Sequence, residues 1–424
     1  MAEVSKINGI SIYAAKSVSN TRVNTVKSIS SSPDILKRAM CWTIKYGQNS
    51  SNQWLCTHTA SAFDVENPTN VTEENYAPSG SWDAFWQNGY GNSGMSAQTF
   101  GVDSLGIYWW GAVRSNDIIR AFMHTTSSQV VDGNLQLNTD WAWPYDASGM
   151  SNPRRMKHVT FGAFDRVWLI GKGGTHDVES LNISYSDPQQ TNNQMSFEQI
   201  PNFNSGDIRE CIPIYCGHRK YAAVQGNSFF INTGSLSSSV ADANQWIKRT
   251  DPGITEGSAA SYAAYGNHPE YPDGVFVVLG KGNREIKVST DNGASWSSAT
   301  VGGGGTTRPI QGVCYDSRRR QFIAVGNFGT ILTSSASDVT EWAVAGGNSD
   351  YNGDAGSTHY GVSTDGFNVV VTGLNEIKIS TGSLEVFETI PYFTSKTSGK
   401  SVGSEGTLDN FEIWGATPSK ISLP

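Results

Sequence analysis

A short apolar segment followed by a second one recurs along nearly all of the 424-residue sequence. In the better copies the first segment ends in glycine, as in residues 322–326, and a polar turn separates it from the second. Self-similarity of this kind is typical of architectures in which one supersecondary unit repeats. The copies are residues 53–56, 107–111, 167–171 with 181–184, 221–225 with 229–232, 276–280 with 286–289, 322–326 with 330–333, 369–373 with 377–380, and 411–415 with 420–422.

Each repeated unit predicts four short strands, the last of them returning from a hairpin that closes on an aromatic residue. Segments rich in Val, Ile, Phe and Tyr between Gly, Ser, Asn and Asp turns, at a spacing of ~8–12 residues, predict an all-β fold. The longer fixed period favours radially repeated four-stranded blades, that is, a β-propeller. Because no segment has a sustained 3.6-residue periodicity, we expect very little helix. The closing aromatics are Trp141, Phe197, Trp246, Trp296, Trp342 and Phe387.

Residues 289–296 combine a tight polar turn with a tryptophan at a fixed offset. Asp291 can accept hydrogen bonds from nearby backbone N–H groups, Gly293 can adopt a positive φ, and Trp296 begins a returning strand. Together with Ser289 they give the pattern Ser-x-Asp-x-Gly-x-x-Trp. This pattern resembles the Asp-box, or BNR repeat, of sialidase-type β-propellers. The resemblance implies a structural hairpin in the outer part of a blade, away from the ligand-binding end, and no particular reaction.

The repeats predict one propeller over residues 38–424, preceded by a segment, residues 1–37, that contributes a closing strand. The last unit has only three strands before the sequence ends, and an open ring would expose unpaired backbone. Residues 10–13 or 26–29 could supply the missing outer strand. The eight copies favour eight blades, with seven as the alternative if the poorest copy, residues 40–77, is not a blade.

Composition excludes several classes of protein. A net charge of −8 argues against nucleic-acid binding, because phosphate contacts need clustered Lys and Arg. Residues 1–15 lack the features of a signal peptide, and no stretch approaches the ~20 apolar residues of a membrane span. We therefore expect synthesis in a host cytoplasm and no membrane contact. The cysteines Cys41, Cys56, Cys211, Cys216 and Cys314 lie in apolar strand patterns, which favours core positions over a disulfide framework or a metal site.

No set of residues predicts catalysis or a cofactor. The seven histidines form no paired metal-ligand motif, and residues 350–354 resemble only the beginning of a calcium loop. The Asp-box resemblance would imply three arginines around a substrate carboxylate if the protein were a sialidase. The early arginines, Arg22 and Arg38, lack the expected neighbours, and residues 318–320 lie in a turn on the opposite face. The sequence thus predicts a non-enzymatic protein without metal or cofactor.

Two of the long connections between units are rich in aromatic residues, and we take them as the candidate contact surface. Alternation places the rings of the second connection on one side of an extended strand. These rings could fill gaps between the early blades, stack on sugars, or contact another subunit. The candidate residues are Trp82, Trp86 and Tyr90 in the first connection, and Trp141, Trp143 and Tyr145 in the second.

An acidic, Ser/Thr/Asn/Gly-rich propeller without a catalytic set is similar to the structural propellers of bacteriophage tails and fibres. The resemblance implies a structural or adhesion component of a virion, located in a tail, nozzle or fibre and acting through protein–protein contacts. Its partners would be other virion proteins, further copies of the chain in a homo-oligomer, and a host-surface glycan during host attachment. The alternative is a carbohydrate-binding or glycoside-hydrolase propeller of the sialidase type.

Overall fold

The computed structural model describes the strands between Lys6 and Lys420 and gives side-chain detail mainly in the second half of the chain. With short gaps, side chains are described for residues 211–232, 245–255, 260–302, 309–345, 358–373 and 378–388. The described residues contain no α-helix, which agrees with the absence of helical periodicity in the sequence. The protein is therefore nearly all β in the part that the structure describes.

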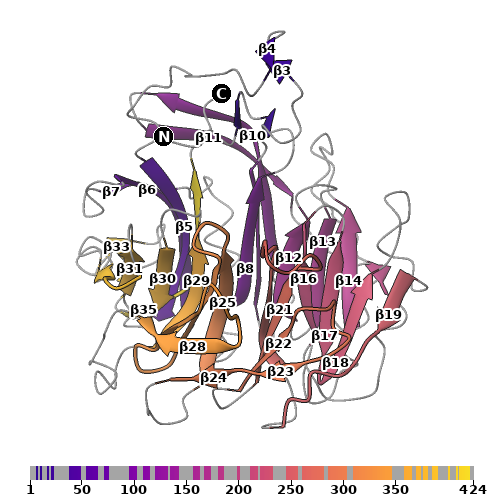
Figure 1. Ribbon diagram of the computed structural model, residues 1–424. Coiled ribbons are helices and arrows are strands. Elements are labelled where there is room, and N and C mark those ends of the chain that lie inside the picture. The colour runs from indigo at the N-terminus through magenta and orange to yellow at the C-terminus, as the bar shows by residue number, and fades with distance from the viewer. Residues whose placement is uncertain are drawn as a thin grey trace.

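The described strands form seven sheets of four or five strands (Figure 1). In six of them, four consecutive strands lie side by side and antiparallel, and in one of these six β24 is added in parallel next to β28. The sheets comprise β8 (Met95–Val102), β9 (Tyr108–Arg114), β10 (Arg120–Val131) and β11 (Asn134–Ala142); β12 (Met156–Gly162), β13 (Val167–Lys172), β14 (Ser180–Tyr185) and β15 (Glu198–Gln199); β16 (Cys211–Tyr215), β17 (Tyr221–Gln225), β18 (Ser228–Asn232) and β19 (Trp246–Lys248); β20 (Ala260–Gly266), β21 (Val275–Gly280), β22 (Ile286–Ser289) and β23 (Ser297–Ser298); β24 (Thr300–Val301), β25 (Ile310–Asp316), β26 (Gln321–Gly326), β27 (Ile331–Ser334) and β28 (Glu341–Val344); and β29 (His359–Thr364), β30 (Val369–Gly373), β31 (Glu376–Ser380) and β32 (Glu388–Thr389).

The seventh sheet joins the two ends of the chain. Its order is β35 (Asn410–Lys420), β5 (Arg38–Gln48), β6 (Trp54–Asp64) and β7 (Val71–Asn75). Three two-stranded pairs complete the described strands: β1 (Lys6–Ile7) with β2 (Ile10–Ser11), β3 (Ser17–Val18) with β4 (Thr21–Arg22), and β33 (Lys400–Ser401) with β34 (Thr407–Leu408).

The second strand of each unit forms the core. The strands β17, β21, β26 and β30 are buried along nearly their whole length. Both of their faces are covered because each sheet packs on the next: one apolar cluster joins sheets β16–β19 and β20–β23, and the following clusters join the later sheets in the same way. This explains why the repeat appears in the sequence as uninterrupted apolar runs rather than as alternation.

The sheets also contact one another through their first strands. Along the chain, β8 contacts β12, β12 contacts β16, β16 contacts β20, β20 contacts β25, β25 contacts β29, and β29 contacts β35. The strand β35 in turn contacts β8. Consecutive four-stranded antiparallel sheets that meet in this order have the arrangement of blades in a propeller.

The C-terminal copy of the repeat differs from the sequence prediction. Residues 411–415 and 420–422 were expected in two strands of an eighth unit, but β35 is one strand that runs through Lys420 with a register shift between Ile413 and Ala416. It pairs with β5 over most of the length of β5, so the first and last copies of the repeat lie in one sheet. The irregularity near Gly415 explains why the pattern looked like the end of a strand.

The described strand that pairs with β35 comes directly after the N-terminal segment, residues 1–37. This strand is β5, which begins at Arg38. Ile10 pairs with Ile7 within a local two-stranded ribbon, and residues 26–29 lie outside the described residues. The long ladder between β35 and β5 offers many more backbone hydrogen bonds than a two-residue strand could, so β5 is the stronger partner.

The connection between sheets β20–β23 and β24–β28 contains a short strand. Residues 300–308 link the sheets β20–β23 and β24–β28, and within them β24 pairs in parallel with β28, the outer strand of the next sheet. Thr300 N donates to Thr340 O at 2.8 Å, and Gly302 N donates to Trp342 O at 2.7 Å. The connection therefore covers an edge that would otherwise expose unpaired backbone groups.

Candidate functional site

The 289–296 hairpin, which links β22 to β23, is held by the Asp291 carboxylate. This carboxylate accepts hydrogen bonds from Ser295 N at 2.9 Å, from Ser295 Oγ at 2.6 Å and from Ser289 Oγ at 2.9 Å. Gly293 N donates to Ser289 Oγ at 2.8 Å, and Gly293 has a φ of 77°. Burial alone would raise the pKa of Asp291, but the hydrogen bonds from Ser295 and Ser289 hold it below its usual value. The structure thus brings three of the four motif residues together in the turn.

The fourth motif residue fastens the hairpin to the preceding sheet. Trp296 Nε1 donates to the main-chain oxygen of Thr250, just after β19, at 2.9 Å. Thr250 returns two bonds to the hairpin, from its N to Gly293 O at 3.1 Å and from its Oγ1 to Ala294 O at 2.7 Å. The half-buried Trp296 ring packs edge-on against Phe229 of β18, with 5.0 Å between centroids. The hairpin therefore joins two sheets.

Gly293 is required at this contact for two reasons. Its φ of 77° lies in the left-handed region that side chains disfavour. A Cβ added there would also lie 2.4 Å from the Phe229 ring. The close approach of the hairpin to the preceding sheet depends on the missing side chain.

Lys220 bridges the same two sheets from the turn before β17. Its Nζ donates to Asn292 Oδ1 at 2.6 Å and to Asp273 O at 3.0 Å, both in sheet β20–β23 or its turns. The ammonium lies 4.8 Å from the centroid of the Tyr265 ring, in cation–π range. Burial lowers the pKa of Lys220, while Cys216 and Asp273 act in the opposite direction.

The next junction, between sheets β20–β23 and β24–β28, uses His268 in place of Lys220. His268 lies in the turn between β20 and β21 and is 1% exposed. Its Nε2 lies 3.1 Å from Ala336 O, in the hairpin of the next sheet, and its ring centroid is 6.3 Å from that of Tyr315. A side chain of the first turn in one sheet thus again reaches the outer hairpin of the next.

Asp316 makes the following junction and involves the arginine-rich turn. This carboxylate is fully buried and accepts hydrogen bonds from Arg318 N and Arg319 N, each at 3.0 Å, and from the Arg319 guanidinium. Thr364 Oγ1, at the end of β29, donates to it at 3.2 Å. The middle arginine of residues 318–320 is therefore used in a structural ion pair.

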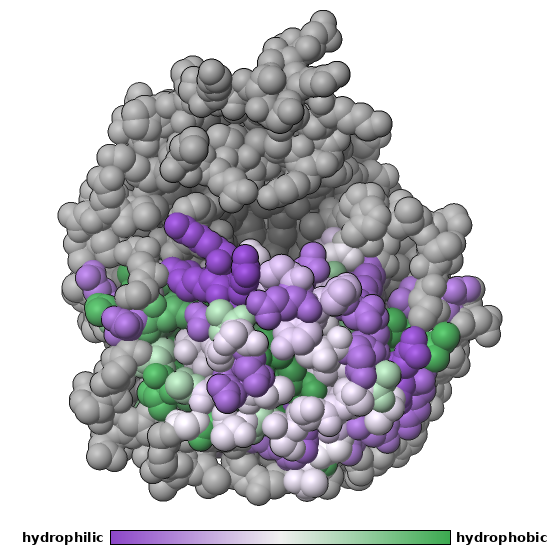
Figure 2. All heavy atoms as spheres, in the orientation of Figure 1, coloured by the Kyte–Doolittle hydropathy of each residue, from purple (hydrophilic) through white to green (hydrophobic). Residues whose placement is uncertain are grey.

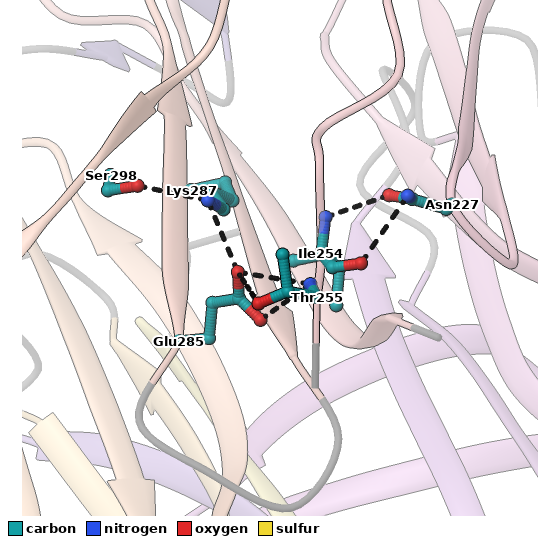
Figure 3. A network of polar contacts seen from close by, with 6 residues as sticks. All are labelled: Asn227, Ile254, Thr255, Glu285, Lys287 and Ser298. Carbon is teal, nitrogen blue, oxygen red and sulfur yellow. Dashed lines mark hydrogen bonds and ion pairs between the residues drawn. The ribbon is translucent and has the colours of Figure 1, made fainter. Parts of the chain in front are cut away.

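A polar network fixes the opposite ends of the strands in sheets β16–β19 and β20–β23 (Figure 3). Asn227 Oδ1 accepts from Ile254 N at 2.9 Å, and the Glu285 carboxylate accepts from Thr255 N at 3.0 Å. Lys287 Nζ lies 3.2 Å from Glu285 Oε1 and donates to Ser298 Oγ at 2.9 Å. The connection from β19 to β20 is thereby fixed to both sheets.

The described side chains do not assemble a metal centre: no group of three or more His, Cys, Asp or Glu among them could hold an ion. Cys211 and Cys216 are buried and Cys314 is partly buried, all as free thiols. Burial raises the pKa of Cys216 and Cys314, so these thiols stay protonated. They occupy the core positions that the sequence predicted. Cys41 and Cys56 lie in strands whose side chains are not described.

Most of the candidate contact surface lies outside the described residues. Trp141 belongs to β11, the edge strand of its sheet, where it pairs with Met123 of β10. The other candidates, Trp82, Trp86, Tyr90, Trp143 and Tyr145, fall outside the described residues.

Elsewhere on the described surface, apolar side chains are scattered. The exposed large apolar residues are Ile247, Phe328 and Val386, which come from three different sheets. Figure 2 shows one face, where the coloured residues are mainly hydrophilic or of intermediate hydropathy and the apolar ones form small separate groups. No helix in the described part of the chain is long and apolar enough to cross a bilayer.

Sequence reasoning missed Lys220, Thr250 and His268. Thr250 accepts a bond through its main-chain oxygen, and His268 bonds to the main-chain oxygen of Ala336. Every residue has a main-chain oxygen, so the residue type does not indicate which one is used. Lys220 and His268 both lie in the turn between the first two strands of a unit. Lys220 directly precedes β17, whereas His268 lies seven residues before β21, so the two turns share no sequence pattern that would have identified them.

No protein-family model and no curated protein sequence matches this chain. Solved structures with a similar backbone include YCF48 bound to D1 peptide, at 11% identity and a TM-score of 0.49, covering 78% of this chain and 92% of that one. YCF48 from Cyanidioschyzon merolae gives 11% identity and a TM-score of 0.44, with coverage of 76% and 95%. The WD40 repeats of RRP9 give 9% identity and a TM-score of 0.43, with coverage of 71% and 81%. None of these scores reaches 0.5, so no activity or partner follows from them.

Proposed function

We propose that this protein is a non-enzymatic structural or adhesion component of a bacteriophage virion that acts through protein–protein contacts. The observation that carries the proposal is the use made of the polar side chains at the sheet junctions. Asp291, Asp316, His268 and Lys220 are residue types that enzymes use for chemistry, yet here Asp291 holds its own turn and the other three link neighbouring sheets. Links of this kind make the arrangement of the sheets rigid.

Rigidity of this kind suits a particle component. Three successive junctions connect the four sheets from β16–β19 to β29–β32. Each junction combines a buried apolar cluster with at least one polar link between the two neighbouring sheets. Catalytic carboxylates usually keep part of their hydrogen-bonding capacity for the substrate. Asp316 instead accepts from two backbone N–H groups, a guanidinium and a hydroxyl, which favours a structural role.

The same proposal includes a specific architecture. We infer that the seven sheets are seven blades of one ring, closed where β35 joins β5, and that the 289–296 hairpin is an Asp-box. The contacts that run from β8 through β29 to β35 and back to β8 support the ring. The hydrogen bonds of Asp291 and the position of Trp296 support the Asp-box. This favours the alternative blade number over the eight that the repeats suggested.

The function is tested on virus particles and on the purified chain in parallel. Particles purified on a density gradient are digested and searched for peptides of this chain by mass spectrometry, and an antibody against it locates the chain on particles by immunogold labelling. We expect the chain in stoichiometric amounts at one place on the particle. Its absence from washed, infectious particles would contradict the proposal.

The carbohydrate alternative is tested with the same preparation. Purified protein is screened against sialosides and bacterial surface polysaccharides for hydrolysis and for quenching of tryptophan fluorescence. We expect no hydrolysis. Saccharide-dependent quenching that Trp141→Ala or Trp82→Ala abolishes would assign glycan binding to the candidate contact surface, and clear hydrolysis would replace the structural proposal by an enzyme.

A further inference from the structure

One part of the molecule extends beyond its own sheet. The strands β10 and β11 are longer than their neighbour β9, which pairs with β10 only from Arg120 to His124. Beyond that point β10 pairs with β11 alone, through six register pairs from Thr125 with Thr139 to Val131 with Asn134. We call residues 125–131 and 134–139 the β10–β11 arm. Figure 1 shows it near the top, running away from the rest of its sheet.

The composition of the arm differs from that of the chain. Its paired residues include no Asp, Glu, Lys or Arg, and Asp132, between the two strands, is the one charged residue of residues 125–139, whereas the whole chain carries a net charge of −8. Its register pairs alternate in character: Val130 pairs with Leu135, while the adjacent Gln129 pairs with Gln136. Alternate pairs belong to opposite faces of a two-stranded ribbon. By residue type, one face of the arm is mainly apolar, with Val130, Leu135 and Leu137 beside Ser128. The other face is uncharged and mainly polar, with both glutamines, Ser127, Asn134 and Asn138 beside Val131.

Two strands that pair only with each other are poorly stable on their own. A two-stranded hairpin is at best marginally stable in water and needs further strands or a packed face. Strand edges without charged residues are also ready templates for pairing with another chain, and proteins normally block such edges with lysine or proline. A long, uncharged arm whose described strands pair only with each other fits an element that is completed by a partner.

We propose that the β10–β11 arm is a self-association surface whose partner is the same arm in a second copy of this chain. This rests on the proposed function and names one of its protein partners. Two copies that each carry a net charge of −8 repel each other over most of their surface. An uncharged arm is where they can approach without that repulsion. In a two-fold contact each arm meets its own sequence, so apolar meets apolar and amide meets amide.

The test places charges on the arm and then makes them complementary. Sedimentation velocity is measured over a concentration series for the wild type, Gln129→Lys, Gln129→Glu, and an equimolar mixture of the two variants. We expect the wild type to self-associate and each single variant to show a dissociation constant raised about tenfold or more, because like charges meet across the contact. The mixture should recover association as Lys faces Glu.

A matched control distinguishes the effect of a charge on the arm from the effect of a change in net charge. Ser297→Lys adds the same charge at an exposed position on β23, far along the chain, and should self-associate like the wild type. Circular dichroism and the melting temperature check that all variants fold. Recovery in the mixture cannot come from misfolded chains.

Several outcomes would overturn the inference. A wild-type chain that stays monomeric at its highest attainable concentration would do so, as would a folded Gln129→Lys variant that associates like the wild type. A mixture of folded variants that stays monomeric would also refute arm-to-arm pairing. The proposed function fails separately, through absence from particles: a monomeric chain found in virions keeps that function and removes this inference.

Discussion

Two outer hairpins at the same place in consecutive units use their tryptophans differently. In the 289–296 hairpin the indole N–H of Trp296 donates to Thr250 O in the preceding sheet, and the ring is half-buried. In the hairpin between β27 and β28, Trp342 is 3% exposed and its N–H donates to Val339 O, 3.0 Å away in the same hairpin. Trp296 joins two sheets through a polar bond, whereas Trp342 is buried in the apolar cluster that its sheet shares with the preceding one.

The carboxylates of the two hairpins follow the same division. Asp291 supports a turn that presents Gly293 and Asn292 to the preceding sheet. Asp338 accepts from Thr340 N at 2.9 Å and from Thr340 Oγ1 at 2.6 Å, both within its hairpin. In the 289–296 hairpin the tryptophan and the turn that Asp291 supports are thus directed to the preceding sheet, whereas in the next hairpin Asp338 and Trp342 bond within the hairpin and the polar link to the preceding sheet comes from His268. Substitutions in the two hairpins test this contrast.

The largest effect is expected from the buried tryptophan. Trp342→Ala should lower the free energy of unfolding by about 3–5 kcal/mol, because it removes a large ring from a close-packed cluster. Urea unfolding followed by fluorescence and circular dichroism measures this loss. Trp342→Phe, which keeps most of the buried area, should cost much less. A loss in Trp342→Ala no larger than that in Trp296→Ala would contradict the contrast.

Gly293→Ala should be the next most damaging change. Alanine at this position would have to adopt a φ of 77°, and its Cβ would lie 2.4 Å from the Phe229 ring. We therefore expect the free energy of unfolding to fall by about 2–4 kcal/mol. Gly217→Ala is the matched control: Gly217 has a φ of 83°, but a Cβ there meets nothing within 4 Å. It should show the backbone penalty alone, about 1 kcal/mol. Equal losses in the two variants would show that the approach to Phe229 is unimportant.

Trp296→Phe isolates the bond between the sheets. It retains an aromatic ring beside Phe229 but removes the donor to Thr250 O, so we expect a loss of about 0.5–1.5 kcal/mol. Hydrogen exchange gives the sharper readout. The amide of Thr250, which donates to Gly293 O, should exchange faster in Trp296→Phe and at the wild-type rate in Trp342→Phe. Unchanged exchange in Trp296→Phe would show that the indole bond does not hold the junction.

The smallest effect is expected at Asp291 and depends on pH. The hydrogen bonds of the folded state hold its pKa below the unfolded value. The stability they contribute is therefore present above the unfolded pKa and is lost as the pH falls through the folded pKa. Asp291→Asn should cost about 0.5–1 kcal/mol at neutral pH, since solvent reaches the partly exposed carboxylate and weakens its interactions. The difference from wild type should disappear in acid. A constant difference across the pH range would exclude the carboxylate as its source.

The sequence predicted the inner parts of the units well and their junctions poorly. Strands β17, β21 and β30 begin or end within a residue of the predicted segments, because each is an apolar run bounded by turn residues. The strand β24 was missed because two residues that add to a neighbouring sheet form no pattern of their own. The β35–β5 pairing was missed because it joins segments from opposite ends of the chain, and nothing local specifies it.

The candidate site shows the same limit. Ser289, Asp291, Gly293 and Trp296 could be recognised because their hydrogen bonds and turn geometry are local. Thr250 and His268 could not be recognised, because each takes part in a bond between a side chain and a main-chain oxygen of a different sheet. The oxygen of Thr250 accepts from Trp296, and His268 bonds to the oxygen of Ala336. Contacts between units depend on how sheets pack, which residue types report only indirectly.

The pairing of β35 with β5 has a consequence for synthesis on the ribosome. One sheet needs strands from the beginning and the end of a 424-residue chain. At ~5–20 residues per second, the partner of β5 leaves the ribosome tens of seconds after β5 itself. During that time one edge of the eleven-residue strand β5 lacks its partner strand β35. Chaperones, or the β35 strand of another copy translated nearby, can therefore bind the open edge of β5 in a nascent copy until its own β35 emerges.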